Sequence, residues 1–149
     1  MITRIIIQRI KEVLFNGKTI MVFGPRQSGK TTLLEMLAGE LQEKVLFLDC
    51  DEPDVRKELT DVTSTQLMQR FGDAKVVMID EAQRIKNIGI TLKLIHDKIK
   101  SVQLIVTGSS SLELTSELSE PLTGRKYEFL LLPLSIAEMI RHTDMITEK

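Results

Sequence analysis

Five short apolar runs, separated by segments with helical periodicity, constrain the fold of this chain most strongly. Runs of this length, bounded by turn residues, are typical of strands that are buried on both faces. They are TIMVF (19–23), VLFL (45–48), VVMI (76–79), QLIV (103–106) and YEFLLL (127–132). Such strands, alternating with helices, favour a parallel sheet that is covered by helices on both faces. We therefore expect a doubly wound α/β fold with five strands.

The segments between the runs predict the helices. The apolar side chains from Ile85 to Ile99 are spaced 3, 4, 3 and 4 residues apart, as on a helix with one buried face. Ser135 and Glu138 have the spacing of a capping box, which is typical of a helix start. Helices are expected over 4–15, 30–43, one or two within 53–72, Ile85 to Ile99, 110–118 and after Ser135.

Composition narrows the class of protein. A chain of 149 residues suits one domain, and a net charge of -1, from 20 basic and 21 acidic residues, gives no support for direct nucleic-acid binding. The single cysteine, Cys50, excludes an intramolecular disulfide. No run approaches the about 18 apolar residues of a membrane span. We expect a cytoplasmic protein that does not enter the membrane.

The first apolar run leads directly into GPRQSGKT, which fits the phosphate-binding pattern G-x-x-x-x-G-K-[ST]. Glycines let the backbone N–H groups converge on phosphate oxygens, and the following helix start adds positive charge. Lys30 is expected to reach the β- and γ-phosphates, and the Thr31 hydroxyl to bind Mg²⁺. A chance match in a turn is the alternative. The expected nucleotide-binding residues are Gly24, Pro25, Arg26, Gln27, Ser28, Gly29, Lys30, Thr31 and Thr32.

Two acidic residues, Asp80 and Glu81, follow the third apolar run. A carboxylate at the end of a buried strand is costly unless it meets a cation, and Mg²⁺ shared with Thr31 is the expected partner of Asp80. Glu81 can orient and deprotonate a water aimed at the γ-phosphate. The alternative is that the pair only caps the helix that contains Ile85.

Polar residues after the fourth run and before the fifth complete the candidate site. A hydroxyl among 107–110, with Ser109 preferred, could contact the γ-phosphate or the attacking water; the alternative is a helix cap. Arg125 could stabilise charge in the transition state, in its own site or a neighbour's. The alternative for Arg125 is an ordinary surface arginine.

The segments GPRQSGKTTLL, VLFLDCDEP, VVMIDEAQRI, LIVTGSSS and LTGRKYEFLLLPLS occur in this order. Together they resemble a prokaryotic family of AAA-like P-loop ATPases over roughly residues 4–140. The resemblance implies the strand order 5-1-4-3-2. It also implies Walker A roles for Lys30 and Thr31, Walker B roles for Asp80 and Glu81, a sensor role for Ser109 and a late arginine at Arg125. Gln83 matches the family's local pattern, but no mechanism follows for it.

The resemblance also bears on domain organisation. Members usually continue into a C-terminal domain of unknown function, and the helical lid of AAA proteins is missing here. We expect residues 1–149 to form a single AAA-like ATP-binding domain that lacks the family's C-terminal domain. The partners that we expect are further copies of this chain, in a homo-oligomer, or a C-terminal partner domain.

These patterns predict Mg²⁺-dependent ATP hydrolysis coupled to an unidentified client. ATP is favoured over GTP because no [NT]-K-x-D motif follows the fourth run. Two alternatives stay open: a nucleotide-gated interaction module with little turnover, and a P-loop kinase for a small molecule. The kinase is disfavoured because Arg84, Arg125 and Arg141 are scattered along the chain.

Other reactive residue types receive structural interpretations. Cys50 is expected to pack in the core rather than act as a nucleophile. His96 and His142 have no metal-ligand company, so no zinc site is expected. The acidic segment 49–54 is expected to be a solvated loop rather than a second metal site.

Overall fold

The computed structural model describes residues 2–25, 29–109, 124 and 126–131. Five strands form one sheet in the order β2-β3-β4-β1-β5, and every neighbouring pair is parallel. This confirms the expected five-stranded parallel sheet and its order, 5-1-4-3-2. The strands are β1 (Thr19–Phe23), β2 (Val45–Asp49), β3 (Val76–Asp80), β4 (Gln103–Gly108) and β5 (Lys126–Leu130).

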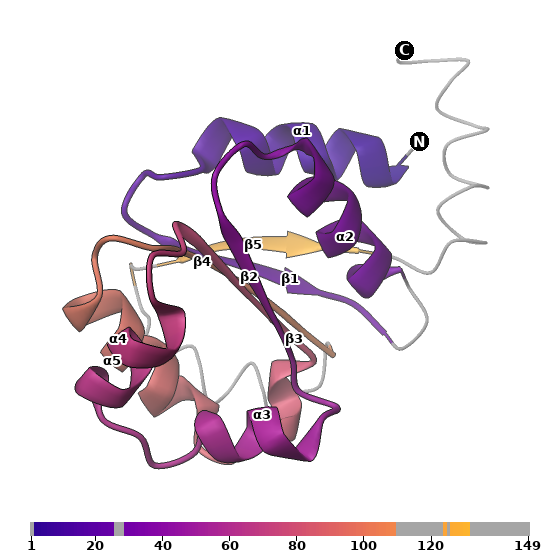
Figure 1. The fold of residues 1–149 in the computed structure, drawn as a ribbon. Coiled ribbons are helices and arrows are strands. Elements are labelled where there is room, and N and C mark those ends of the chain that lie inside the picture. Colours follow the sequence, from indigo (N-terminus) through magenta and orange to yellow (C-terminus); the bar gives the residue numbers. More distant parts are fainter. Residues whose placement is uncertain (1, 26–28, 110–123, 125, 132–149) are drawn as a thin grey trace, which may run out of the picture.

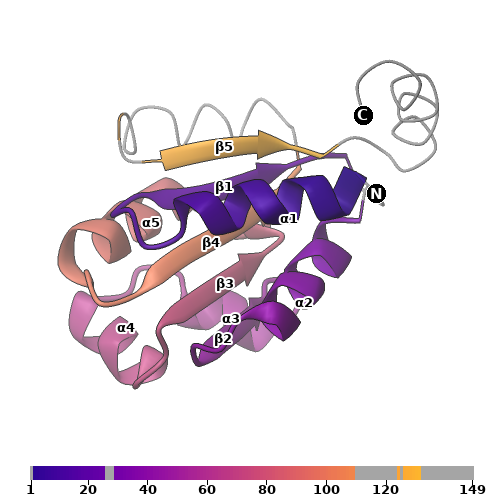
Figure 2. The ribbon, with the colours of Figure 1, turned by 90° about the horizontal axis from the view of Figure 1, so that it is seen from above.

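Helices cover both faces of the sheet. Two of them, α1 and α2, lie on one face, and α3, α4 and α5 lie on the other (Figures 1 and 2). A 3₁₀ turn, η1, follows β3 directly. The bounds are α1 (Ile2–Val13), α2 (Lys30–Glu40), α3 (Pro53–Glu58), α4 (Ser64–Phe71), η1 (Ala82–Arg84) and α5 (Ile88–Lys98). The helices expected over 110–118 and after Ser135 lie outside the described residues.

The alternation of side chains along β1 produces two hydrophobic cores. Ile20 and Val22 pack in the cluster beneath α1 and α2, whereas Met21 and Phe23 pack in the cluster beneath α4 and α5. Successive residues of a strand point to opposite faces, so a continuous apolar run serves both cores. Every residue of β1 is buried, which explains why its composition shows no polar alternation.

Three helices differ from the sequence-based expectation. The helix expected over 4–15 is α1, which begins at Ile2 and ends at Val13. The helix expected from Ile85 begins only at Ile88, because Asn87 adopts a left-handed conformation with φ 58° and interrupts the helix. Ile85 still packs in the core, from the turn after η1. It therefore fits the apolar spacing of a helix although it is not helical. The helix expected over 30–43 ends at Glu40, since Leu41 is extended.

The loops that carry the candidate site residues meet at one edge of the sheet. β4 lies between β1 and β3. Near its end, Gly108 pairs with Phe23 of β1, and Val106 pairs with Ile79 of β3. The N–H of Gly24 donates to the carbonyl of Gly108 over 3.2 Å, which continues the ladder into the first loop. In such sheets ligands bind beyond the carboxyl ends of the strands.

Candidate nucleotide-binding site

The loop after β1 encloses the side chain of Lys30, the first residue of α2. Gly29 has φ 93°, a left-handed conformation that a side chain would strain, and α2 begins at the next residue. Lys30 is 3% exposed, and its Nζ donates to the carbonyls of Gly24 and Pro25 over 2.8 and 2.9 Å. The ammonium is therefore fixed where phosphates would lie in a loop of this kind. Arg26, Gln27 and Ser28 lie outside the described residues.

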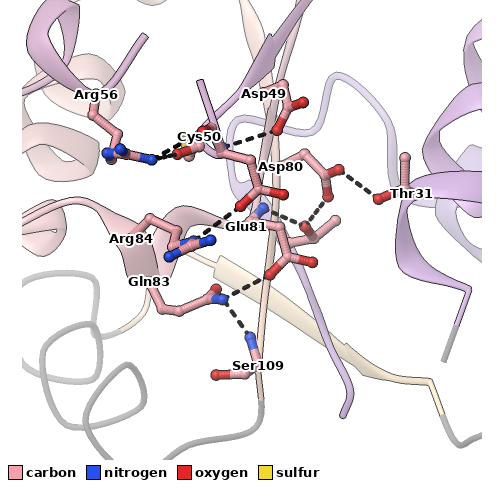
Figure 3. A network of polar contacts seen from close by, with 11 residues as sticks. Thr31, Asp49, Cys50, Arg56, Asp80, Glu81, Gln83, Arg84 and Ser109 are labelled. Atoms are coloured by element: carbon pink, nitrogen blue, oxygen red, sulfur yellow. Dashed lines mark hydrogen bonds and ion pairs between the residues drawn. The ribbon is translucent and has the colours of Figure 1, made fainter. Parts of the chain in front are cut away.

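The carboxylate of Asp80 receives hydrogen bonds from two hydroxyls on different elements (Figure 3). Thr31 Oγ1, in the first turn of α2, donates to Asp80 Oδ2 over 2.6 Å. Thr107 Oγ1, on β4, donates to Asp80 Oδ1. Asp80 is 2% exposed, so a negative charge is held nearly out of water between two neutral donors. Such a charge is stabilised further by a cation.

The donor set suits Mg²⁺ bound together with a nucleotide. Mg²⁺ prefers oxygen ligands and is usually held by one or two carboxylates plus phosphate oxygens. Thr31 Oγ1 and Asp80 Oδ2 are hard oxygen donors 2.6 Å apart, next to the phosphate loop. Within the described ranges, no group of three or more His, Cys, Asp or Glu side chains could hold a metal ion without further ligands. The residues present therefore fit the ion only as a partner of bound phosphate.

Glu81 has an unusual backbone conformation, which a hydrogen bond from its own N–H stabilises. Its φ and ψ are 60° and 48°, a left-handed conformation that a glutamate seldom adopts. Its N–H donates to Thr107 Oγ1 over 2.9 Å, so the same hydroxyl contacts Asp80 and Glu81. Strained backbone of this kind persists where the surrounding structure over-determines it, and it gathers at functional sites.

The alternative role of the acidic pair, as a cap for the following helix, does not match the geometry. The residue before α5 is Asn87, six positions after Glu81, and neither acid caps that helix. Glu81 precedes η1 but makes no side-chain cap hydrogen bond there. The two carboxylates are therefore available to the site.

Gln83 connects Glu81 to the end of β4. Its Nε2 donates to Glu81 Oε1 over 2.6 Å, and its Oε1 accepts the backbone N–H of Ser109 over 3.1 Å. The two bonds use both ends of the amide and are drawn in Figure 3. Sequence reasoning found no mechanism for Gln83, because only the fold shows that β4 ends beside η1.

The sensor position also differs in emphasis from the sequence-based choice. Ser109 is the residue that the sequence favours among 107–110, and it does lie beside Gln83, but its contact there is made by the backbone N–H. The hydroxyl that joins the two acidic residues belongs to Thr107, which is fully buried. Its burial could not be read from the sequence, where it follows an apolar run like any strand end. Ser110 and Arg125 lie outside the described residues.

Arg56 and Arg84 hold the acidic loop after β2. Arg56 Nη1 donates to the carbonyls of Cys50 and Asp51 over 2.8 and 3.1 Å, and Arg84 Nε donates to Asp51 Oδ1 over 2.9 Å. The N–H of Asp51 donates to Asp49 Oδ1 over 2.9 Å. Of the segment 49–54 that was expected to be a loop, Asp49 ends β2 and α3 begins at Pro53, so the loop itself is 50–52.

Cys50 is a buried, unreactive thiol. Burial, and then the negative charges of Asp80, Asp49 and Asp51, raise its pKa from 9.0 to about 12. Thiolate is the reactive form of cysteine, so almost none is present near neutral pH. The interpretation of Cys50 as a packing residue rather than a nucleophile fits this environment.

The amino ends of the strands carry a separate hollow. A cavity of about 230 Å³ is lined by residues of the turn before β1, the end of α5 and the start of β4. His96 borders it, with Nε2 3.0 Å from the Gly17 carbonyl and Nδ1 3.0 Å from Asp97 Oδ1. The contact with Gly17 ties α5 to the turn after α1, whereas the contact with Asp97 lies within α5. The cavity lies at the end of the sheet opposite the phosphate loop.

Residues 16–140 match the family model described as an AAA domain. The chain belongs to the AAA domain family. This confirms the resemblance to AAA-like P-loop ATPases, and it makes the chain a P-loop nucleotide-binding domain. The family fixes the class of domain and leaves the client open.

Two relatives show how much of a longer protein this AAA domain spans. Uncharacterized protein Rv2008c of Mycobacterium tuberculosis is 31% identical over 118 residues, which are 78% of this chain and 25% of that protein. Uncharacterized protein MJ1544 of Methanocaldococcus jannaschii is 23% identical over 149 residues, 98% of this chain and 33% of that protein. The chain thus spans a quarter to a third of the length of these relatives.

Two solved structures illustrate the fold that this chain shares with other proteins. A chain in the structure of Drosophila ORC bound to AT-rich DNA and Cdc6 has a TM-score of 0.65 at 12% identity, over 89% of this chain and 56% of that one. Pif1 helicase from Candida albicans has a TM-score of 0.58 at 13% identity, over 97% and 42%. At such identity the likeness shows the fold alone. No helix among the described residues is long and apolar enough to cross a membrane.

Proposed function

We propose that this AAA domain binds ATP with Mg²⁺ and hydrolyses it in order to act on a client that the sequence does not identify. The observation that carries the proposal is one chain of hydrogen bonds. It runs from Thr31 through the carboxylate of Asp80 to Thr107, and from Thr107 to the backbone of Glu81. The proposed metal ligands and the proposed base are thereby joined through Thr107, across α2, the end of β3 and β4.

Phosphate binding is assigned to the first loop. The N–H groups around Gly24 and Gly29, with the start of α2, would face phosphate oxygens, and Lys30 Nζ would exchange its carbonyl partners for them. Thr31 Oγ1 and Asp80 Oδ2 would hold Mg²⁺, which when bound neutralises charge on the phosphate oxygens. Pro25, Arg26, Gln27, Ser28 and Thr32 complete the proposed binding loop.

Water activation is assigned to Glu81. The carboxylate would accept a proton from water as the water oxygen bonds to the γ-phosphorus and the bond from that phosphorus to the bridging oxygen of ADP breaks. The left-handed backbone and the bond to Thr107 set the direction in which the side chain leaves β3. Oε1 accepts from Gln83, so Oε2 is the oxygen assigned to the water.

Two further roles stay as proposals from the sequence. Ser109 would sense the γ-phosphate from the end of β4, and Arg125 would stabilise transition-state charge, in its own site or in that of a neighbouring copy. An arginine that acts between copies would require a homo-oligomer. A partner domain is equally compatible with relatives that are three to four times as long as their matched regions. ATP is proposed over GTP, since TGSSS stands after β4 in place of a guanine-recognition motif.

A nucleotide-gated interaction module is the second candidate. It is favoured by one observation: the match covers 25% of Rv2008c and 33% of MJ1544, so most of the length of these relatives lies outside the matched region. In this role, ATP binding would change a surface without rapid turnover.

The two candidates are separated by phosphate release and nucleotide binding, measured together. For the ATPase, Glu81→Gln is expected to keep ATP affinity and to lose turnover by roughly 100-fold or more. Lys30→Ala is expected to lose affinity. A rate per molecule that rises with protein concentration would indicate a shared site. An unmutated protein that binds ATP but turns over no faster than Glu81→Gln would reject the ATPase in favour of the module.

A further inference from the structure

We propose that Gln83 is a positioning residue for Glu81, and that it acts by donating its amide N–H to the Glu81 carboxylate. This inference rests on the proposed hydrolytic role of Glu81 and adds the residue that orients it. The amide lies two residues after Glu81, in η1, and is held on its other side by β4.

The bond from Gln83 to Glu81 determines which carboxylate oxygen can act. Gln83 Nε2 lies 2.6 Å from Oε1, so this oxygen accepts a hydrogen bond and Oε2 is left for water. A neutral amide donor orients a carboxylate without neutralising its charge. A lysine or arginine in the same place would compensate that charge and weaken the base. The choice of glutamine therefore suits a base that must be fixed and remain able to accept a proton.

The bond from Ser109 to Gln83 determines how the amide is oriented. A side-chain amide can be turned by 180°, which would exchange its oxygen and nitrogen. The Ser109 N–H is a donor only, so it requires the oxygen of Gln83 on its side and thereby directs the NH₂ group to Glu81. Glu81, which can only accept when ionised, imposes the same choice from the other side. The bridge is thus self-consistent at both ends.

Together with Thr107, Gln83 restrains Glu81 at two points. Thr107 fixes the backbone N–H over 2.9 Å, and Gln83 fixes the side-chain end over 2.6 Å. Both restraints originate at the end of β4, Thr107 directly and Gln83 through Ser109. A small misplacement of a catalytic group can cost up to about 100-fold in rate, so this support is expected to appear in kcat rather than in nucleotide affinity.

Two substitutions separate the donor from the acceptor of Gln83. Gln83→Met keeps the length of the side chain and removes both hydrogen bonds. Gln83→Glu keeps an oxygen for the Ser109 N–H but replaces the donor by a second carboxylate that faces Glu81. Gln66→Glu is the matched control, because Gln66 Oε1 accepts the Thr63 N–H on α4, far from the site, and a glutamate can do the same.

The expected kinetic result is a loss of kcat with unchanged ATP affinity. Gln83→Met should lower kcat by roughly tenfold to 100-fold at every pH. Gln83→Glu should lower kcat by a similar factor, because its carboxylate repels that of Glu81 and cannot donate a hydrogen bond to it. Gln66→Glu should show neither effect.

Amide hydrogen exchange provides a second measurement that needs no nucleotide. The Ser109 N–H should exchange faster in Gln83→Met and stay protected in Gln83→Glu. The inference is overturned if Gln83→Glu keeps full kcat, or if Ser109 protection survives in Gln83→Met. An unmutated rate no higher than that of Glu81→Gln would instead overturn the ATPase proposal, and this positioning role with it.

Discussion

Thr107 Oγ1 donates a hydrogen bond to the carboxylate of Asp80 on the neighbouring strand. The same oxygen accepts the N–H of Glu81, so one buried hydroxyl serves a proposed metal ligand and a proposed base. We therefore expect Thr107→Val, which keeps the shape and removes the hydroxyl, to lower stability by about 1–3 kcal/mol and to lower ATP turnover. Urea unfolding and phosphate release measure the two effects.

Thr91→Val is the matched control for Thr107→Val. Thr91 is also a buried threonine, and its Oγ1 donates to the Leu59 carbonyl over 2.9 Å, away from the site. It should lose about 1 kcal/mol of stability while keeping full turnover per folded molecule. Equal turnover in the two variants would show that Thr107 has a structural role only.

Thr19→Val is expected to stabilise the protein. Thr19 is 1% exposed, and its hydroxyl has no hydrogen-bond partner within the described part of the chain. Burying a hydroxyl without a partner costs about 1–3 kcal/mol, and a methyl group of the same size avoids that cost. The midpoint of thermal unfolding should therefore rise. A clear fall would mean that the hydroxyl is satisfied by a buried water.

The Cys50 thiol is expected to make the protein less stable at high pH. Its pKa is 9.0 ordinarily and about 12 in the folded state, so between these values the unfolded chain loses a proton that the folded chain keeps. Stability is then unaffected below about pH 9 and falls as the pH rises towards 12. The free energy of unfolding of Cys50→Ala, measured in urea, should fall less steeply between pH 8 and 10 than that of the unmutated protein. Parallel curves would contradict the assigned pKa.

The Glu40 carboxylate is expected to contribute to stability only above acidic pH. Hydrogen bonds from Lys11 and then Arg4 lower its pKa below 4.5, and they join the end of α2 to α1. For a lowered pKa, the contribution is present above about pH 4.5 and is lost as the pH falls through the folded value. Glu40→Gln should therefore destabilise the protein at pH 7, and the difference from the unmutated protein should shrink as the pH falls below about 4.5. A difference that does not change as the pH falls would point to packing instead.

The sequence was sufficient for features that depend on local composition. Thr19–Phe23 was placed with correct bounds, because an uninterrupted apolar run between turn residues has no competing interpretation. The order of the strands came from the resemblance, and the sheet confirms it. Asp80 and Glu81 were assigned to the site from their place after a strand, and they do lie beside Thr31 and Thr107.

Features that depend on long-range contact or on a single backbone angle could not be predicted. The bridge from Gln83 to Ser109 joins residues 26 positions apart. The start of α5 at Ile88 depends on the left-handed Asn87, a conformation that the apolar spacing does not encode. Ser109 is the residue that the sequence favours among 107–110, yet the hydroxyl that contacts both acidic residues is the buried one of Thr107. The roles of residues 26–28 and Arg125 stay predictions.

The enclosure of Lys30 has a consequence for which anions the loop can accept. Its ammonium is already stripped of most water and rests on the partial charges of two carbonyl oxygens. An incoming anion gains little by displacing those dipoles unless its oxygens carry a denser charge than a carbonyl. We therefore expect chloride and other singly charged anions to compete only weakly for Lys30. A polyphosphate chain, which presents several charged oxygens, should displace the two carbonyls more readily.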